Sequence, residues 1–346
     1  MMKNAASNRF GFQLLALILA LGITSLILLA VGASPFQVFT DMFTGSLGSV
    51  KKISDVLVGW VPLLLVTSGL LITFAAGLWN IGVEGQITLG AIGTTMTLRS
   101  LQDSGMNPAL IITLSILAGM FAGALWAALA GALKTFGGVN EIFGGLGLNF
   151  VATALTIYLI FGPWKRPGTG SMSGTEPFAD PLHLPLFEGL RLSPWALVIA
   201  IAGIVFVYFL LQGTYFGLRL KAVGRNFRAA YLLGIPTWQY MMFSFLLCGA
   251  LAGAAGALQV TAVYYRLIPA ISSGYGYLGL MVAMLINYQA IWAVPVALFF
   301  AALNIGSIQL PILHKLDSSL SGVLQGMLVL FVLLAEGARQ RFTPKA

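Results

Sequence analysis

The sequence predicts an all-α, polytopic membrane protein. Hydrophobic residues make up 58% of the chain, charged residues only 8%, and the mean hydropathy is +0.93, whereas a soluble domain carries about 25% charged residues. Apolar runs of roughly the 20 residues needed to cross a bilayer recur along the chain. The polar segments between them are too short for a soluble domain. We therefore expect residues 1–346 to form a single transmembrane domain.

The apolar runs predict about ten membrane-spanning helices, several of them short or broken. The first run, Phe10–Val31, follows Lys3 and Arg9 and resembles a signal peptide. It exceeds the roughly 7–15 apolar residues of a signal peptide, so we interpret it as the first span. The segment Pro35–Val50 is expected to lie at the membrane interface. The expected spans are Phe12–Val31, Ser54–Ala76, Gln86–Leu98, Pro108–Lys134, a helix ending at Phe161, Pro194–Leu211, Trp238–Ala262, a helix ending near Asn287, Ile291–Leu310 and Leu320–Ala335.

The charges predict the orientation of these helices. An even number of spans leaves both termini on the same side, together with the segment Gly213–Thr237. That segment contains Arg219, Lys221, Arg225 and Arg228 and no acidic residue. Short basic loops stay in the cytoplasm. We therefore expect both termini to be cytoplasmic and the proline-rich loop Gly162–Ser193 to lie outside the cytoplasmic membrane.

The segment Ala75–Gly90 is unusually polar for its apolar surroundings. It contains Asn80, Glu84 and Gln86 and four glycines. Polar groups are costly in lipid unless they face protein or water, and glycine allows the backbone to turn. We interpret the segment as a broken helix that lines an internal cavity. A similar glycine-rich stretch, Ile271–Ala283, gives a faint internal repeat of two halves, and paired interrupted helices are typical of a transport pathway.

Each polar side chain near these breaks has two interpretations. Glu84 is either an ion or proton site or, as we favour, a carboxylate that accepts backbone N–H bonds at the start of a helix. The amides of Asn80, Asn140, Asn149, Gln259 and Asn287 either bind a polar solute or join helices, and together they favour a polar cavity. The predicted solute-path residues are Asn80, Glu84, Gln86, Asn140, Asn149 and Asn287. Glycine and alanine faces at Gly119–Gly131 and Gly249–Gly256 predict close helix packing.

Several kinds of chemistry are excluded. No lysine follows a glycine, so the G-K-[ST] core of a phosphate-binding loop is missing. The sequence offers no convincing catalytic set and no metal-ligand cluster, since His183 and His314 are far apart, and Cys248 has no disulfide partner. We expect no enzyme activity, no cofactor and no metal. The net charge of +8 is attributed to the membrane surface rather than to nucleic acid.

The basic segment has three interpretations: binding of anionic lipid, orientation of the chain, or docking of a partner. Residues Arg225–Leu233 form a short amphipathic pattern followed by Gly234 and Pro236. A short helix held between two spans is the shape expected of a docking element.

These segments carry a resemblance to a known family. N-I-G-V-E-G-Q at 80–86, L-K-A-V-G-R-N-F-R-A-A-Y-L-L-G-I at 220–235 and S-S-G-Y-G-Y-L-G-L-M-V-A-M-L at 272–285 resemble the simple-sugar and branched-chain amino acid class of ABC importer permeases. V-N-E-I-F-G-G-L-G-L-N-F at 139–150 and G-P-W-K-R-P at 162–167 are most similar to its nucleoside-uptake branch. The F-G-G-L-G after V-N-E departs from the more apolar run of that branch.

The resemblance implies a function and partners. It implies the permease subunit of an ABC importer, most similar to those for nucleosides, with a ribose-like sugar permease as the alternative. An ion-coupled secondary transporter is the competing class. The implied partners are a cytoplasmic ATPase, a second permease (the same chain or a paralogue), an extracytoplasmic solute-binding protein and membrane lipid. The implied ATPase-coupling residues are Gly224, Arg225, Asn226, Arg228, Ala229, Ala230 and Gly234.

Overall fold

The computed structural model describes residues 18–168, 174–286, 288–314 and 319–342, and all regular secondary structure among them is helical. The chain groups into two compact units, one formed by residues up to Val56 and from Leu298 onward, the other by Leu57–Ala297. Both dividing points fall inside continuous helices, α3 (Val50–Ala75) and α12 (Ala293–Ser307). The all-helical prediction is confirmed for the described residues, and the single transmembrane domain stays a prediction.

Apart from the 23-residue helix nearest its C-terminal end, the helices that lie wholly in the first unit are short. Helix Ile18–Ala30 and α2 (Pro35–Leu47) are bent by 110° from each other. They are followed, after the intervening unit, by α13 (Gln309–His314) and α14 (Leu320–Phe342). The buried side chains Leu28, Val38, Met42 and Leu310 form an apolar cluster here. The segment Pro35–Val50 contains α2, and its location at the membrane interface stays a prediction.

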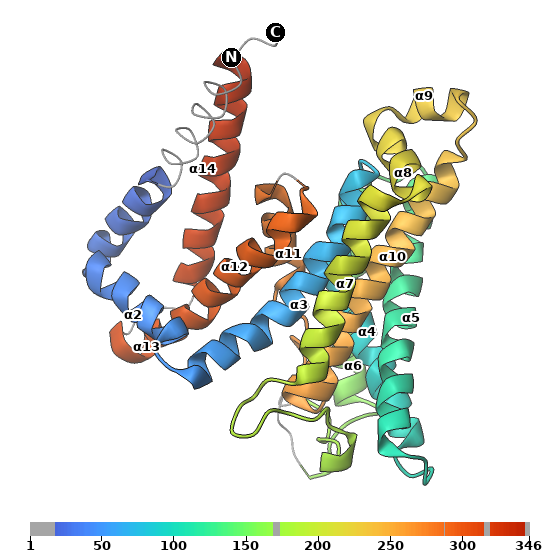
Figure 1. Cartoon of the computed structure of the whole chain (residues 1–346). Helices are drawn as coiled ribbons and strands as arrows, with labels where there is room; N and C mark the ends of the chain where they lie inside the picture. The colour runs from blue at the N-terminus through green and yellow to red at the C-terminus, as the bar shows by residue number, and fades with distance from the viewer. Residues whose placement is uncertain (1–17, 169–173, 287, 315–318, 343–346) are drawn as a thin grey trace. The chain divides into compact units, whose positions relative to one another are not determined.

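The second unit contains the longest helices (Figure 1). In Figure 1, α9 lies at one end of this unit, and the loop between α6 and α7 lies at the opposite end. The unit consists of most of α3, α4 (Val83–Leu101), α5 (Pro108–Thr135), α6 (Glu141–Phe161), η1 (Asp180–Leu182), α7 (Pro194–Gly213), α8 (Tyr215–Arg225), α9 (Phe227–Leu232), α10 (Thr237–Leu258), the π-helix η2 (Gln259–Tyr264), α11 (Tyr275–Leu285), η3 (Ala290–Trp292) and the first residues of α12.

Helices α4, α5 and α10 pack backbone against backbone. A Cβ atom on Gly123 of α5 would lie 2.7 Å from the Cα of Gly253 in α10, and one on Gly90 of α4 would lie 2.8 Å from the carbonyl carbon of Gly253. No side chain fits at these crossings. The predicted small-residue faces on α5 and α10 are therefore confirmed, and α4 contributes a third. Close approach of this kind maximises van der Waals contact between helices that lie in lipid.

Six helices among the described residues are long and apolar enough to cross a membrane, or up to seven if the bent pair counts as one span. The predicted number of ten is not confirmed. Helix α4 is absent from the six, since the threonines and Glu84 lower its hydropathy, and α11 is short. The six are Val50–Ala75, Pro108–Thr135, Glu141–Phe161, Pro194–Gly213, Thr237–Tyr264 and Ala290–Leu313.

The proline-rich loop between α6 and α7 is fastened to the end of α10. The backbone N–H groups of Phe178 and Leu184 each donate at 2.9 Å, to the carbonyl oxygens of Tyr265 and Thr261, respectively. The His183 ring stacks on Tyr265 with centroids 3.8 Å apart. The described part of this loop is thus held by the π-helix η2 and by Tyr265, which directly follows it.

The glycine crossing gives a test of the packing. Gly253→Ala places a methyl group against the backbone of α5 and is expected to lower the free energy of unfolding by about 1–3 kcal/mol, the usual cost of overpacking. Gly147→Ala in α6 is the matched control, because a Cβ there meets no atom within 4 Å. Thermal unfolding of the purified proteins in one detergent compares the two. Equal melting temperatures for both variants would contradict the packing described here.

Candidate functional site

The candidate site is built around the break between α3 and α4. Helix α3 ends in a Schellman motif: the N–H of Leu78 donates to the carbonyl of Thr73, that of Gly77 donates to the carbonyl of Phe74, and Gly77 has φ +73°. Residues 76–82 are non-helical and α4 begins at Val83. The glycine at position 77 thus reverses the chain, as the sequence predicts for a broken helix.

Asn80 and Gln86 form a buried amide pair. The Asn80 side chain donates to Gln86 Oε1 at 3.0 Å and accepts from Gln86 Nε2 at 2.9 Å, and it also donates to Cys248 Sγ at 3.1 Å. The exposed fractions of the two side chains are 1% and 0%. In this conformation the pair joins the break to α4 and α10. Contact of either amide with a solute stays a prediction.

Helix α6 fixes the other side of the break. Asn149 accepts from the Gly85 N–H at 2.8 Å and donates to the Ile81 carbonyl at 3.0 Å, so a single amide binds backbone on both sides of the α4 start. The Glu141 carboxylate pairs with Lys134 of α5 at 2.6 Å and also accepts a hydrogen bond from the backbone of Trp79. The α6 N-terminus is therefore anchored to α5 and to the break.

The remaining predicted amides lie elsewhere. Asn140 is the N-cap of α6, where its side chain accepts from the Ile142 N–H at 2.9 Å. Asn287 lies outside the described residues. Of the six predicted solute-path residues, Asn80, Glu84, Gln86 and Asn149 are thus gathered at the α3–α4 break, and Asn140 lies at the start of α6.

Glu84 connects the two glycine-rich breaks. Its carboxylate oxygens accept from the N–H of Gly274 at 3.0 Å and of Gly276 at 2.6 Å, at the N-terminus of α11. Gly274 is the N-cap of α11 and has φ +74°. The favoured interpretation of a carboxylate at the start of its own helix thus needs correction: Glu84 does bind backbone N–H groups, but those of a helix about 190 residues further along the chain. The two stretches that the sequence pairs as a repeat are in contact.

The predicted coupling segment spans the end of α8 and all of α9, two helices that are separated by the single residue Asn226. Asn226 ends α8 and caps α9, where its side chain accepts from the Ala229 N–H at 3.0 Å. The chain leaves α9 through Gly234, which has φ +79°. Leu232 and Leu233 expose 84% and 80% of their surface. The C-terminal end of this six-residue helix is therefore not covered by any described part of the chain, although Ala230 of the same helix is buried.

The coupling segment contacts the α3–α4 break directly. A Cβ on Gly77 would lie 2.9 Å from the Gly224 carbonyl oxygen, and one on Gly224 would lie 2.8 Å from the Gly77 nitrogen. The last turn of α8 therefore lies on the turn that ends α3, with no side chain between them. We call this contact the Gly77–Gly224 joint.

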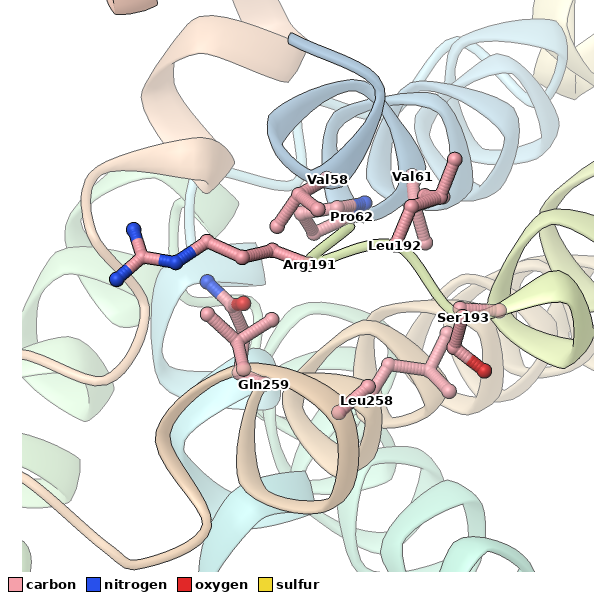
Figure 2. A pocket seen from close by; sticks show the side chains of 11 residues that line it. Val58, Val61, Pro62, Arg191, Leu192, Ser193, Leu258 and Gln259 are labelled. Carbon is pink, nitrogen blue, oxygen red and sulfur yellow. The ribbon is translucent and has the colours of Figure 1, made fainter. Parts of the chain in front are cut away.

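A small, mostly apolar cavity lies at the other end of the second unit (Figure 2). Its volume is about 10 Å³, and it is lined by Pro62 of α3, by Arg191 and Ser193 before α7, and by Gln259 at the start of η2. This is the size of one water molecule. A sugar or nucleoside does not fit, so Gln259 has no solute-sized space beside it in this conformation.

Three residues of the site are missed by the sequence reasoning. Lys134 and Glu141 form an ion pair, and Cys248 contacts Asn80 rather than only filling the core. Opposite charges on the two sides of the glycine-rich turn between α5 and α6 are a signal that would have identified the pair. No local signal marks Cys248, because its partner is 168 residues away.

The comparisons with known proteins agree on one family. A family model described as "Branched-chain amino acid transport system / permease component" matches residues 52–333. The chain is 31% identical to the glucose ABC transporter permease protein TsgB13 of Haloferax volcanii, over 94% of this chain and 88% of that protein. It is 28% identical to the guanosine ABC transporter permease protein NupP of Bacillus subtilis, over 92% and 91%.

A further relative and a solved structure complete the comparison. The nucleoside ABC transporter permease protein NupB of Lactococcus lactis is 27% identical over 88% of this chain and 85% of that protein. PsaBC from Streptococcus pneumoniae, solved in complex with a Fab, matches with a TM-score of 0.50 at 11% identity, over 86% of this chain and 95% of that chain. The solved structure supports the fold alone.

The Glu84 contact gives a test of its role. Glu84→Gln retains one acceptor oxygen but turns an NH₂ group toward the second N–H of α11. The variant is expected to lose about 1–3 kcal/mol of folding stability, the cost of an unsatisfied buried group. Glu188→Gln, an exposed carboxylate in the α6–α7 loop, is the control. Thermal unfolding of both purified variants measures the difference. Unchanged stability in Glu84→Gln would contradict the anchoring role.

Proposed function

Since the chain belongs to the family of permease components of branched-chain amino acid transport systems, we propose that it carries nucleosides across the cytoplasmic membrane as a subunit of an ABC importer. At the level of the family, the chain is an ABC importer permease, a multi-pass transport component rather than an enzyme. Permeases of this kind work with an ATPase and a solute-binding protein. The second permease of the complex is either this chain or a paralogue.

The proposal that a partner ATPase binds at α9 rests on the exposed apolar end of this helix. Leu232 and Leu233 are almost fully exposed, while Ala230 is buried against the rest of the chain. Exposed leucines at the end of a short, capped helix are costly in water and are stabilised when a partner covers them. Arg225 and Arg228 add positive charge beside them. This end of the second unit is then cytoplasmic, and the α6–α7 loop faces the binding protein.

In the proposed mechanism, ATP-driven movement of the ATPase displaces α9 and the end of α8. The Gly77–Gly224 joint has no side chain that absorbs such a displacement, so the movement reaches the α3–α4 break. The break is tied to α6 by Asn149 and to α11 by Glu84. Movement at the joint therefore changes the position of one glycine-rich break relative to the other. This change opens or closes the solute path between the two permease subunits.

The choice of nucleosides rests on the V-N-E segment and the G-P-W-K-R-P motif. Two of the three relatives above support it at the level of their names, since they are named for guanosine and for nucleosides, whereas the third is named for glucose. Import of a simple sugar is the second candidate, favoured by the 31% identity to the glucose permease. An ion-coupled carrier is less well supported, because both oxygens of Glu84 are occupied by backbone N–H groups.

The docking proposal predicts the effect of one bulky substitution. Ala229→Trp adds a large side chain to the exposed side of α9 and is expected to prevent binding of the ATPase while the permease still folds. The companion Ala230→Trp is less informative, because Ala230 is buried. Gln102→Trp, at an exposed position after α4, is the matched control. Co-purification with the ATPase measures binding, and retention of the ATPase by Ala229→Trp would contradict docking at α9.

The importer proposal predicts ATP-dependent uptake. Proteoliposomes that contain the permease pair and the ATPase, with the binding protein outside and ATP inside, are expected to accumulate guanosine or adenosine. Omission of the ATPase is expected to abolish uptake. Glucose uptake without nucleoside uptake would favour the sugar candidate. Uptake that follows a proton or sodium gradient without any ATPase would contradict the whole proposal.

A further inference from the structure

A cavity of about 450 Å³ lies beside the Gly77–Gly224 joint. The turn Ala76–Leu78 after α3 forms one wall, and Val223, Gly224 and Phe227 of the coupling segment form another. Its volume is within the roughly 300–1,000 Å³ of known small-molecule sites. The cavity is half open, and all the residues that line it belong to this chain.

The polar groups of the cavity favour a neutral ligand that carries hydroxyl groups. Lys134 and Glu141 both line it and neutralise each other through their 2.6 Å ion pair. The ammonium group retains further N–H donors for a ligand. The hydroxyl of Thr135, which also lines the cavity, is buried and has no hydrogen-bond partner among the described residues. The hydroxyl is not accessible from the cavity in this conformation, and a rotation of the Thr135 side chain would bring it to a ligand hydroxyl.

The apolar groups favour a flat ring. Phe227 of α9 and Trp238 of α10 both line the cavity, and each exposes 49% of its surface. Aromatic side chains in a cavity stack on the planar rings of a ligand, and the strength of the stacking depends little on which planar ring the ligand carries. A neutral molecule with a planar heterocycle and several hydroxyl groups combines both features, and a nucleoside is such a molecule.

The position of the cavity gives such a ligand an effect on transport. One wall belongs to the segment proposed to dock the ATPase, and the other belongs to the break that it is proposed to move. A molecule bound between them favours the arrangement in which both walls contact it. By linkage, a ligand that binds this arrangement more tightly shifts the population toward it and away from states of the cycle in which the walls are further apart or closer together.

We propose that this cavity is an inhibitory site that binds nucleosides from the cytoplasmic side and slows their further import. The inference rests on the proposed function, both for the class of solute and for the cytoplasmic orientation of α9. It adds a second nucleoside site, distinct from the solute path, at which the product of transport limits its own accumulation.

The test is import into preloaded vesicles. Proteoliposomes with the complete importer and internal ATP are loaded with unlabelled guanosine or with mannitol, and the initial rate of labelled guanosine uptake is measured. Guanosine loading is expected to lower the rate several-fold in the wild-type protein. Thr135→Val removes the unpaired hydroxyl, and Trp238→Leu removes a stacking surface. Each is expected to raise the inhibitory concentration by about fivefold or more while the rate in mannitol-loaded vesicles stays near that of the wild type.

Matched controls use the same changes away from the cavity. Thr113→Val, near the other end of α5, and Trp195→Leu, at the start of α7, are expected to retain wild-type inhibition. Equal rates in guanosine-loaded and mannitol-loaded wild-type vesicles would overturn the inhibitory site, and so would equal inhibition in the wild type and both cavity variants. Absence of uptake from mannitol-loaded vesicles would instead contradict the proposed function, so the two failures are distinguishable.

Discussion

The structure depends on one constraint: backbone groups freed by a helix break within an apolar bundle must find partners in the protein, because lipid offers none. The α3–α4 break meets it with side chains from several helices. Asn149 binds backbone on both sides of the α4 start, and Glu84 satisfies the N-terminus of α11. The polar residues of these segments, which stand out from the apolar sequence around them, thus form the hydrogen bonds that stabilise the non-helical backbone.

Close packing of α4, α5 and α10 makes this arrangement possible. Their glycines bring the backbones together at Gly90, Gly123 and Gly253, so the break is held against a group of helices that has little room to adjust. Interiors of this kind switch between discrete arrangements rather than deforming continuously. A movement that enters at the Gly77–Gly224 joint is therefore expected to shift whole helices, which fits the alternation of access that an importer requires.

Much of the fold could be predicted from the sequence, because the boundaries of a helix depend on residues that lie close together in the chain. Apolar runs, glycines at helix ends and the Asn226 cap indicate where helices begin and stop, and α9 lies within two residues of the expected coupling helix. The number of spans was less predictable. The polar helix α4 has the length of a span but not its hydropathy, and only its burial among other helices explains why it forms.

The sequence by itself determined the helical membrane class, the two glycine-rich breaks, the short helix α9 and the family, since each is carried by residues close together in the chain. Only the tertiary structure decided which groups satisfy one another. Glu84 binds the start of α11 rather than of its own helix, Asn80 pairs with Gln86 and Cys248, and Gly77 lies against Gly224. These contacts join residues up to 192 positions apart, and no local pattern specifies such partners, because they arise only when the helices pack.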